Sequence, residues 1–319
     1  MTRVGVVDLG TNSTRLLVAD VEGGRVRELE RRLTITRLGE GVDERRLLLP
    51  TAVARVRNAL SDYRRALEGL GAERTLAVAT SAVRDAENGE AFLGEVEWSY
   101  GFDTRLLSGH EEALMTFRGV TAGRDVGPGT LVVDVGGGST ELVLGGPGGV
   151  EWHDSLDLGC VRLTERFLGG DPPSAEELDA CRAHVADVLA ERVPADVRPE
   201  RAVGVAGTVT QLAVLALGLE EEDPALVDGH DLPASWIDEQ VERLAVLPVE
   251  EIRGLRGMHP DRAPVILAGA IVVAETLGRV GLPRLEVTEQ DLMHGAALAA
   301  AELPERPEGA APPGAYTCC

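Results

Sequence analysis

The sequence predicts an α/β protein built from two related halves. Residues 132 to 144 repeat residues 6 to 18 without a gap, and the two copies share Val, Val, Asp, Gly, Ser, Thr and Leu at matching positions. Each copy reads as an apolar strand, a glycine-containing turn and a second apolar strand. The same order of strands and helices follows both copies, and the spacing is far too long for a solenoid repeat.

In the first half, strands are expected at 3–9 and 15–21, followed by an uneven third strand that runs to about Leu38. Residues 37–43 read as an exposed loop. Apolar residues at helical spacing predict a helix over 51–70, which ends at Gly71. A strand at 76–79, a helix to about Glu97, a strand at 104–107 and a helix capped by Ser108 or Gly109 complete this half.

In the second half the hairpin spans 130–145 and a third strand lies near 150–157. Helices are expected near 161–168 and 175–192, with a strand at 201–206. Inserted helical segments occupy 208–218 and 234–254. An apolar helix over 262–279, a strand at 285–287 and a helix over 290–301 follow, and the tail 304–319, rich in Pro, Gly and Ala, is expected to be disordered.

Composition excludes several classes of function. All 31 basic residues are Arg, which excludes a Walker-A phosphate loop and a Schiff-base lysine. A formal net charge of −22 disfavours nucleic acid as a partner. No membrane span or signal peptide is apparent, so a cytoplasmic protein is the default expectation. The cysteines have no metal-ligand spacing and predict no disulfide framework: Cys160, Cys181, Cys318 and Cys319.

The repeated hairpins carry the first candidate site. Asp8 and Asp134 end the first strand of each copy, and Gly10 and Gly136 are expected to supply freedom in φ. N–H groups in such turns can hold an anion, and a neighbouring carboxylate can hold a hard cation. The turn residues predicted to bind phosphate are Gly10, Thr11, Asn12 and Ser13 in the first copy and Gly136, Gly137, Gly138 and Ser139 in the second.

The informative position is the one that differs between the copies. Arg15 aligns with Glu141. The arginine suits a phosphate oxygen and the glutamate suits a magnesium site, while a mutual salt bridge between them is the alternative.

Three further stretches are candidates for phosphate chemistry. Gly207 and Thr208 stand at a strand-to-helix junction, where the alternative is an ordinary N-cap. Arg84 stands at a helix entrance and could contact phosphate or remain solvated. Glu111 and Glu112 are adjacent carboxylates at a helix start, and composition does not say which one could act as a general base.

Five motifs together resemble the Ppx/GppA family of exopolyphosphatases and guanosine pentaphosphate phosphohydrolases. They cover residues 8–15, 79–88, 108–113, 134–141 and 206–208 and occur in the family's order. The resemblance implies two ribonuclease-H-like domains of the actin-like ATPase superfamily with an interdomain cleft. It places the first domain at 1–123, completed by the helix at about 290–301, and the second at 124–289.

The resemblance also implies roles for individual residues. Glu112 is implied as the catalytic base, and the metal-linked carboxylates are Asp134 and Glu141, with Asp8 beside them. Mg²⁺, or another divalent cation such as Mn²⁺, is the implied cofactor. Arg84 is implied as a phosphate contact, and Gly207 and Thr208 are implied to line the far side of the phosphate site.

The implied reaction is the hydrolysis of a terminal phosphoanhydride of inorganic polyphosphate, with water attacking in line. The chain resembles a short form without the family's C-terminal helical domain, so shorter chains are the expected substrates. Hydrolysis of pppGpp is the alternative, and a superfamily kinase or a non-catalytic sensor ranks lower. A homodimer is compatible with the sequence, which does not report on assembly.

Overall fold

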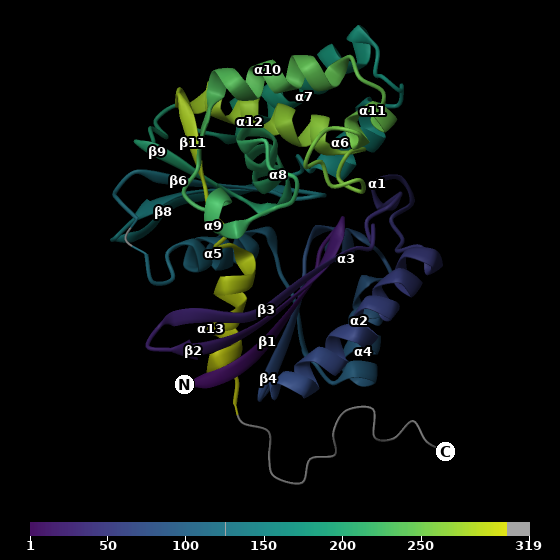
Figure 1. Cartoon of the computed structure of the whole chain (residues 1–319), viewed down its shortest axis with the longest axis vertical. Coiled ribbons are helices and arrows are strands. Elements are labelled where there is room, and N and C mark those ends of the chain that lie inside the picture. Colours follow the sequence, from purple (N-terminus) through teal and green to yellow (C-terminus); the bar gives the residue numbers. More distant parts are fainter. Residues whose placement is uncertain (125, 305–319) are drawn as a thin grey trace. The chain divides into compact units, whose positions relative to one another are not determined.

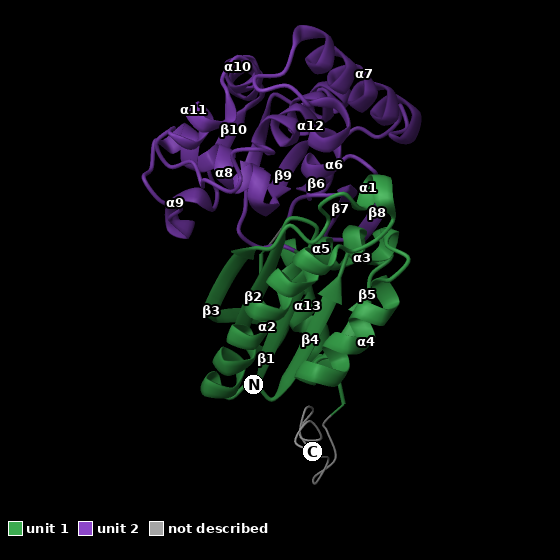
Figure 2. Cartoon of the chain, turned by 90° about the vertical axis from the view of Figure 1, so that its right-hand side faces the viewer, with its two compact units in different colours: residues 1–124, 292–319 green, residues 125–291 purple. Residues whose placement is uncertain are grey.

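The computed structural model describes residues 1–124 and 126–304, and the chain forms two compact units. Unit 1 comprises residues up to Arg124 together with the segment from Leu292, and unit 2 runs from 125 to Asp291 (Figure 2). The tail expected to be disordered lies outside the described residues beyond 304. Within the described part, no helix has the length and apolar character needed to cross a membrane.

Unit 1 is built on a sheet in the order β3-β2-β1-β4-β5. The first three strands are antiparallel, whereas β4 and β5 run parallel to β1. Their bounds are β1 Thr2–Leu9, β2 Ser13–Glu22, β3 Arg25–Ile35, β4 Arg74–Ala79 and β5 Asp103–Leu106.

Helices cover both faces of this sheet, which explains why its central strands are continuously apolar. One face packs on α2, α3 and α4, and the other packs on α5 and α13 (Figure 1). Val7 and Leu9 face the first layer, while Val4 and Val6 face the second. The helices are α1 Val42–Arg45, α2 Pro50–Leu70, α3 Ser81–Asp85, α4 Gly89–Tyr100, α5 Gly109–Val120 and α13 Leu292–Glu302.

Unit 2 repeats the pattern with an added edge strand, in the order β10-β11-β9-β6-β7-β8. Strands β6, β9 and β11 are parallel, and β7, β8 and β10 are antiparallel to their neighbours. The bounds are β6 Thr130–Val135, β7 Thr140–Gly146, β8 Gly149–Leu156, β9 Arg201–Val205, β10 Asp231–Pro233 and β11 Arg284–Val287.

One apolar core holds unit 2 together, with the almost fully buried helix α12 at its centre. Helices α7 and α10 pack against α12 (Figure 1). The helices are α6 Cys160–Phe167, α7 Ala175–Arg192, α8 Ala206–Leu217, α9 Pro224–Val227, α10 Ala234–Ala245, α11 Val249–Arg253 and α12 Ile266–Val280.

Both sheets share the 3-2-1-4-5 strand order of a ribonuclease-H-like fold, so the predicted α/β class and the fold implied by the resemblance are confirmed. The hairpins are also equivalent in register. Asp8 lies opposite Arg15, and Asp134 lies opposite Glu141. The repeat therefore places corresponding side chains at corresponding points of the two sheets.

Some local predictions were wrong. Residues 37–43 are not simply an exposed loop, because Leu38 and Val42 are buried in the core of unit 1 and α1 begins at Val42. The helix expected over 234–254 is interrupted before Val249 by Pro248, and the one expected from Arg262 begins at Ile266. The short elements α1, α9 and β10 had no periodic signal in the sequence.

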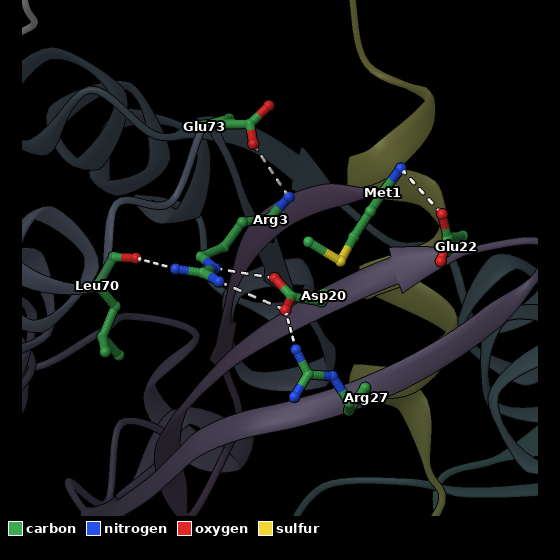
Figure 3. Close-up of polar contacts among 7 residues, drawn as sticks. All are labelled: Met1, Arg3, Asp20, Glu22, Arg27, Leu70 and Glu73. Carbon is green, nitrogen blue, oxygen red and sulfur yellow. Dashed lines mark hydrogen bonds and ion pairs between the residues drawn. The ribbon is translucent and has the colours of Figure 1, made fainter.

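A buried carboxylate ties three strands of unit 1 together at the end remote from the β1–β2 turn (Figure 3). Asp20 on β2 accepts hydrogen bonds from Nε of Arg3 on β1, at 2.8 Å, and from Arg27 on β3. Arg3 also donates to the carbonyl of Leu70 at 2.9 Å, which links the end of α2 to the sheet. The hydrogen bond from Arg3 is the main reason that the pKa of Asp20 is lowered.

Candidate functional site

The two hairpins present opposite electrostatic arrangements at equivalent positions. In the first, Asp8 and Arg15 are directly opposite on antiparallel strands, and both Nε and Nη2 of the arginine lie 2.8 Å from Oδ2 of the aspartate. Arg15 is therefore bonded within its own hairpin. The alternative, a salt bridge between Arg15 and Glu141, stays a prediction.

In the second hairpin the corresponding residues are two carboxylates. Asp134 is 7% exposed and Glu141 is 1% exposed, and directly opposite residues of an antiparallel pair have Cβ atoms about 5 Å apart. Ser155 on β8 donates to Oε1 of Glu141 at 2.7 Å. Like charges at this position repel each other, and a divalent cation with a preference for oxygen ligands would relieve that repulsion.

These carboxylates fit a hard cation in donor type and charge, although they are only two. Among the residues that the structure describes, no cluster of three or more His, Cys, Asp or Glu side chains could hold a metal ion. A cation here would complete its coordination with water or substrate oxygens, which is usual for Mg²⁺. Asp8, predicted as a further metal-linked carboxylate, is already neutralised by Arg15.

The glycines that open the two turns are required for space, so the predicted role of φ freedom was wrong. Neither Gly10 nor Gly136 has a φ in the left-handed region. Each donates its N–H to the carbonyl of the serine three residues on, Ser13 or Ser139, at 3.0 Å. A Cβ would lie 2.8 Å from that carbonyl oxygen at Gly10 and 3.1 Å at Gly136. These two N–H groups close the turns, so the other predicted turn residues remain the candidates for binding phosphate: Thr11, Asn12, Ser13, Gly137, Gly138 and Ser139.

The start of α5 separates the roles of the two adjacent glutamates. Glu111 forms a capping box with Ser108 and also accepts from Arg105 at 2.6 Å. The Ser108 N–H and these two side chains lower the pKa of Glu111 to about 2. Glu112 is buried and accepts from Nη1 of Arg84 at 3.0 Å. Glu111 is thus committed to the helix terminus, and Glu112 is the carboxylate available for chemistry.

Arg84 acts on Glu112 directly in this structure. Its Nη1 also donates to the carbonyl of Leu107 at 2.7 Å, which fixes the guanidinium between the end of β5 and the start of α5. The resulting ion pair holds the Glu112 carboxylate in place. The predicted contact between Arg84 and phosphate stays a prediction.

The junction between β9 and α8 is conformationally strained. Ala206 has a φ of 70°, a region that costs a residue with a Cβ about 1 kcal/mol or more. The next residue, Gly207, has no side chain, and this leaves room for Arg262: a Cβ on Gly207 would lie 3.1 Å from the guanidinium carbon. Such strain is typical of sites where the backbone must present its N–H groups to a ligand.

Arg262 braces this junction and was not identified from the sequence. Its Nη1 donates to the carbonyl of Gly207 at 3.0 Å and lies 3.1 Å from Glu222. The side chain is 10% exposed. Its place in the chain, just before an apolar helix, gave no local signal, because its partners are 40 or more residues away.

Thr208 packs in the interior of unit 2, where it hydrogen-bonds to the Cys160 thiol. A Cβ on Gly269 of α12 would lie 2.5 Å from its methyl group. Burial raises the pKa of Cys160 to about 11, which makes this thiol a poor nucleophile. Thr208 therefore has a packing role, and its predicted contact with phosphate stays a prediction.

The predicted site residues fall in both units. Unit 1 brings Glu112 and Arg84 into contact, and it separately pairs Asp8 with Arg15. Unit 2 places the acidic pair of β6 and β7 and the β9–α8 junction at the same ends of neighbouring parallel strands. The residues that support the two turns lie in the segments after β3 and β8. Aligning these two segments in the sequence, as was done for the hairpins, is the signal that could have identified them.

Comparisons with known proteins identify the family of the chain. The model of the Ppx/GppA phosphatase family matches residues 17–301. Exopolyphosphatase 2 of Mycobacterium tuberculosis is 40% identical over 318 residues, which covers 94% of this chain and 99% of the relative. A crystal structure of the Aquifex aeolicus Ppx/GppA family member is similar with a TM-score of 0.78 and 30% identity, over 94% of this chain and 98% of that one. An exopolyphosphatase structure from Cytophaga hutchinsonii, at 24% identity, has the same fold with a TM-score of 0.85 over 96% of this chain and 100% of that one.

Proposed function

Because this chain belongs to the Ppx/GppA phosphatase family, we propose that it is an exopolyphosphatase, a hydrolase that releases the terminal phosphate of inorganic polyphosphate. The observation that carries the proposal is the different bonding of the two adjacent glutamates. Glu111 caps helix α5, whereas Glu112 is a buried carboxylate held by Arg84. A hydrolase needs a group that activates water, and a positioned carboxylate serves that purpose. The substrate is supported by the name of the relative from Mycobacterium tuberculosis.

In the proposed reaction, unit 1 supplies the base. Glu112 would accept a proton from the attacking water at one of its carboxylate oxygens. Arg84, bonded to Oε2, would fix the direction of the carboxylate before the proton is transferred. No covalent intermediate is required.

Unit 2 would supply charge stabilisation for the phosphoryl group. N–H groups of the second turn would donate to the phosphate oxygens, where negative charge develops during transfer. Asp134 and Glu141 would hold Mg²⁺. When bound, the cation would neutralise charge on the phosphate chain.

The test is phosphate release in the presence of Mg²⁺ from tripolyphosphate, long-chain polyphosphate, pppGpp and ATP in parallel. We expect release from both polyphosphates, faster from the shorter chain, and slower release from pppGpp and ATP. The variant Glu112→Gln, purified in the same way, controls for contaminating phosphatases. Release from pppGpp alone would reject the proposed substrate, and release from none of the four would reject hydrolysis.

A further inference from the structure

The start of helix α6 supports the turn between β6 and β7. The carbonyl groups of all three glycines in this turn, residues 136–138, accept hydrogen bonds from the first residues of α6. The Gly136 oxygen accepts from the Cys160 N–H at 3.0 Å, the Gly137 oxygen from the N–H groups of Val161 and Arg162 at 2.9 and 3.2 Å, and the Gly138 oxygen from the Arg162 side chain at 2.8 Å. The first N–H groups of α6, which have no acceptor within the helix, therefore donate to the carbonyls of this turn.

This arrangement fixes the direction of the turn's own N–H groups. In a planar trans peptide, the C=O of one residue and the N–H of the next point in opposite directions. With the carbonyls directed toward α6, the N–H groups of Gly137, Gly138 and Ser139 are directed away from it. Among the described residues, none accepts a backbone hydrogen bond from these three N–H groups. Successive N–H groups on one side of a turn are suited to bind an anion.

The last of these peptides depends on a side chain. The Gly138 carbonyl is bonded to Nε of Arg162, whereas the two preceding carbonyls are bonded to backbone N–H groups. The Arg162 side chain is only 12% exposed, and its Nη2 lies 4.0 Å from Asp157. Gly159 permits this close approach, because a Cβ there would lie 2.2 Å from the Gly137 oxygen.

In the turn between β1 and β2, backbone N–H groups support the carbonyls in the same way. The Asn12 carbonyl accepts from the N–H groups of Thr36 and Arg37, at 3.1 and 2.8 Å, and the Thr11 carbonyl accepts from the Gly39 N–H at 2.8 Å. A Cβ on Gly39 would lie 2.3 Å from the Thr11 methyl group. Both copies therefore direct their turn carbonyls toward the segment after the third strand, and Arg162 is an addition in the second copy.

We propose that Arg162 is a positioning residue for phosphate binding by the second turn. Its Nε–H holds the Gly138–Ser139 peptide so that the Ser139 N–H faces the phosphoryl group. The inference deepens the proposed function and rests on it, because it assumes that this turn contacts the transferring phosphate. It predicts that the donor at the Nε position matters more than the positive charge.

Two variants separate the donor from the charge. Arg162→Gln places an amide N–H at the position of Nε without a charge, and Arg162→Met has a similar shape with neither donor nor charge. We expect kcat/KM for tripolyphosphate to fall roughly 10- to 100-fold in R162M, mostly through kcat, because bonds to the phosphoryl group strengthen as charge develops. The R162Q variant should recover most of this loss. Arg166→Met removes an exposed arginine that stacks on Phe167 in the same helix and should match the wild type.

The amide resonance of Ser139 provides a readout that does not depend on substrate. In two-dimensional ¹H–¹⁵N spectra it should shift in R162M and stay near its wild-type position in R162Q. Equal losses of turnover in R162Q and R162M would show that Arg162 acts through its charge and would overturn the proposal. Wild-type turnover or an unshifted Ser139 amide in R162M would overturn it as well. If the wild type releases no phosphate from polyphosphate, the proposed function fails, and the Ser139 amide still decides whether Arg162 positions the turn.

Discussion

Two adjacent glutamates at the start of α5 have different environments, and a matched pair of substitutions tests their roles. Glu112→Gln removes the proposed base, and turnover should fall at least about a hundredfold with little change in KM. Glu111→Gln keeps a side chain that can complete the capping box with Ser108, so its turnover should stay within about threefold of the wild type. Steady-state phosphate release from tripolyphosphate measures both.

Because Glu112 is bonded to Arg84, its substitution could also destabilise the site, so the melting temperature is measured as a control. If Glu112→Gln lowered turnover only by unfolding the site, its melting temperature would fall together with its rate. A variant that keeps the wild-type melting temperature and loses turnover supports a chemical role. Wild-type turnover in Glu112→Gln, or an equal loss in Glu111→Gln, would remove Glu112 from the mechanism.

The contrast between the hairpins predicts where a metal ion binds. Asp134→Asn and Glu141→Gln each remove one of two opposed carboxylates, and the affinity for Mn²⁺ or Mg²⁺ should fall by about tenfold or more. Asp8→Asn alters the ion-paired copy and should change that affinity by less than about threefold. Calorimetric titration of the three variants without substrate measures this. An equal loss in Asp8→Asn would instead support the role predicted for Asp8 from the sequence.

At the scale of elements, the repeat predicted both hairpins and their register but misjudged their glycines. The shared Asp, Gly, Ser and Thr positions in the sequence identify the turns. The cause of the glycine requirement is a carbonyl oxygen about 3 Å from the Cβ position at Gly10 and Gly136, which only coordinates reveal. The same holds for Gly39 and Gly159, where the obstructing atoms come from segments that local periodicity does not connect.

The Asp20 cluster gives the β1–β2–β3 sheet a pH-dependent contribution to stability. Its carboxylate has a lowered pKa in the folded state because Arg3 and Arg27 donate to it. A group with a lowered folded pKa stabilises the fold above its ordinary pKa of about 3.9, and this stabilisation is lost as the pH falls below that value. Asp20→Asn should therefore lower the melting temperature at pH 7 and have a smaller effect near pH 3.

Melting curves of the wild type and Asp20→Asn between pH 7 and pH 3 test this sign. Phosphate release at 25 °C should be unchanged, since Asp20 lies at the end of β2 remote from the turn. A difference in melting temperature that stays constant across the range would contradict the assignment to this carboxylate.

At the scale of the whole molecule, the repeat predicted that the two halves contain the same succession of strands and helices, whereas residues added to this shared pattern could not be predicted. Residues 126 apart in the two hairpins occupy equivalent positions in their sheets because each half folds into the same kind of sheet. Arg262, by contrast, supports the β9–α8 junction through contacts with Gly207 and Glu222 that the first half does not contain. Strand β10 has three residues and lies at the edge of its sheet beside β11, so it is too short to show an alternating pattern in the sequence.

The last helix shows how a distant segment completes unit 1. Helix α13 packs against α5 and β1, and Gly295 lies at the closest approach, where a Cβ would be 1.9 Å from the Met115 carbonyl oxygen. His294 of the same helix is 3.0 Å from Glu28 on β3. Its early residues therefore determine how closely α13 fits the rest of the unit.

A pair of glycine substitutions in helices tests this dependence. Gly295→Ala should lower the free energy of unfolding of unit 1 by about 1–3 kcal/mol, because the backbones must separate. Gly278→Ala in α12 meets no atom within 4 Å and should raise that of unit 2 by about 0.5–1 kcal/mol, because alanine is the better helix former. Urea unfolding followed by circular dichroism measures both. A Gly295→Ala variant as stable as the wild type would show that α13 can shift without loss, and unit 1 would then not depend on this contact.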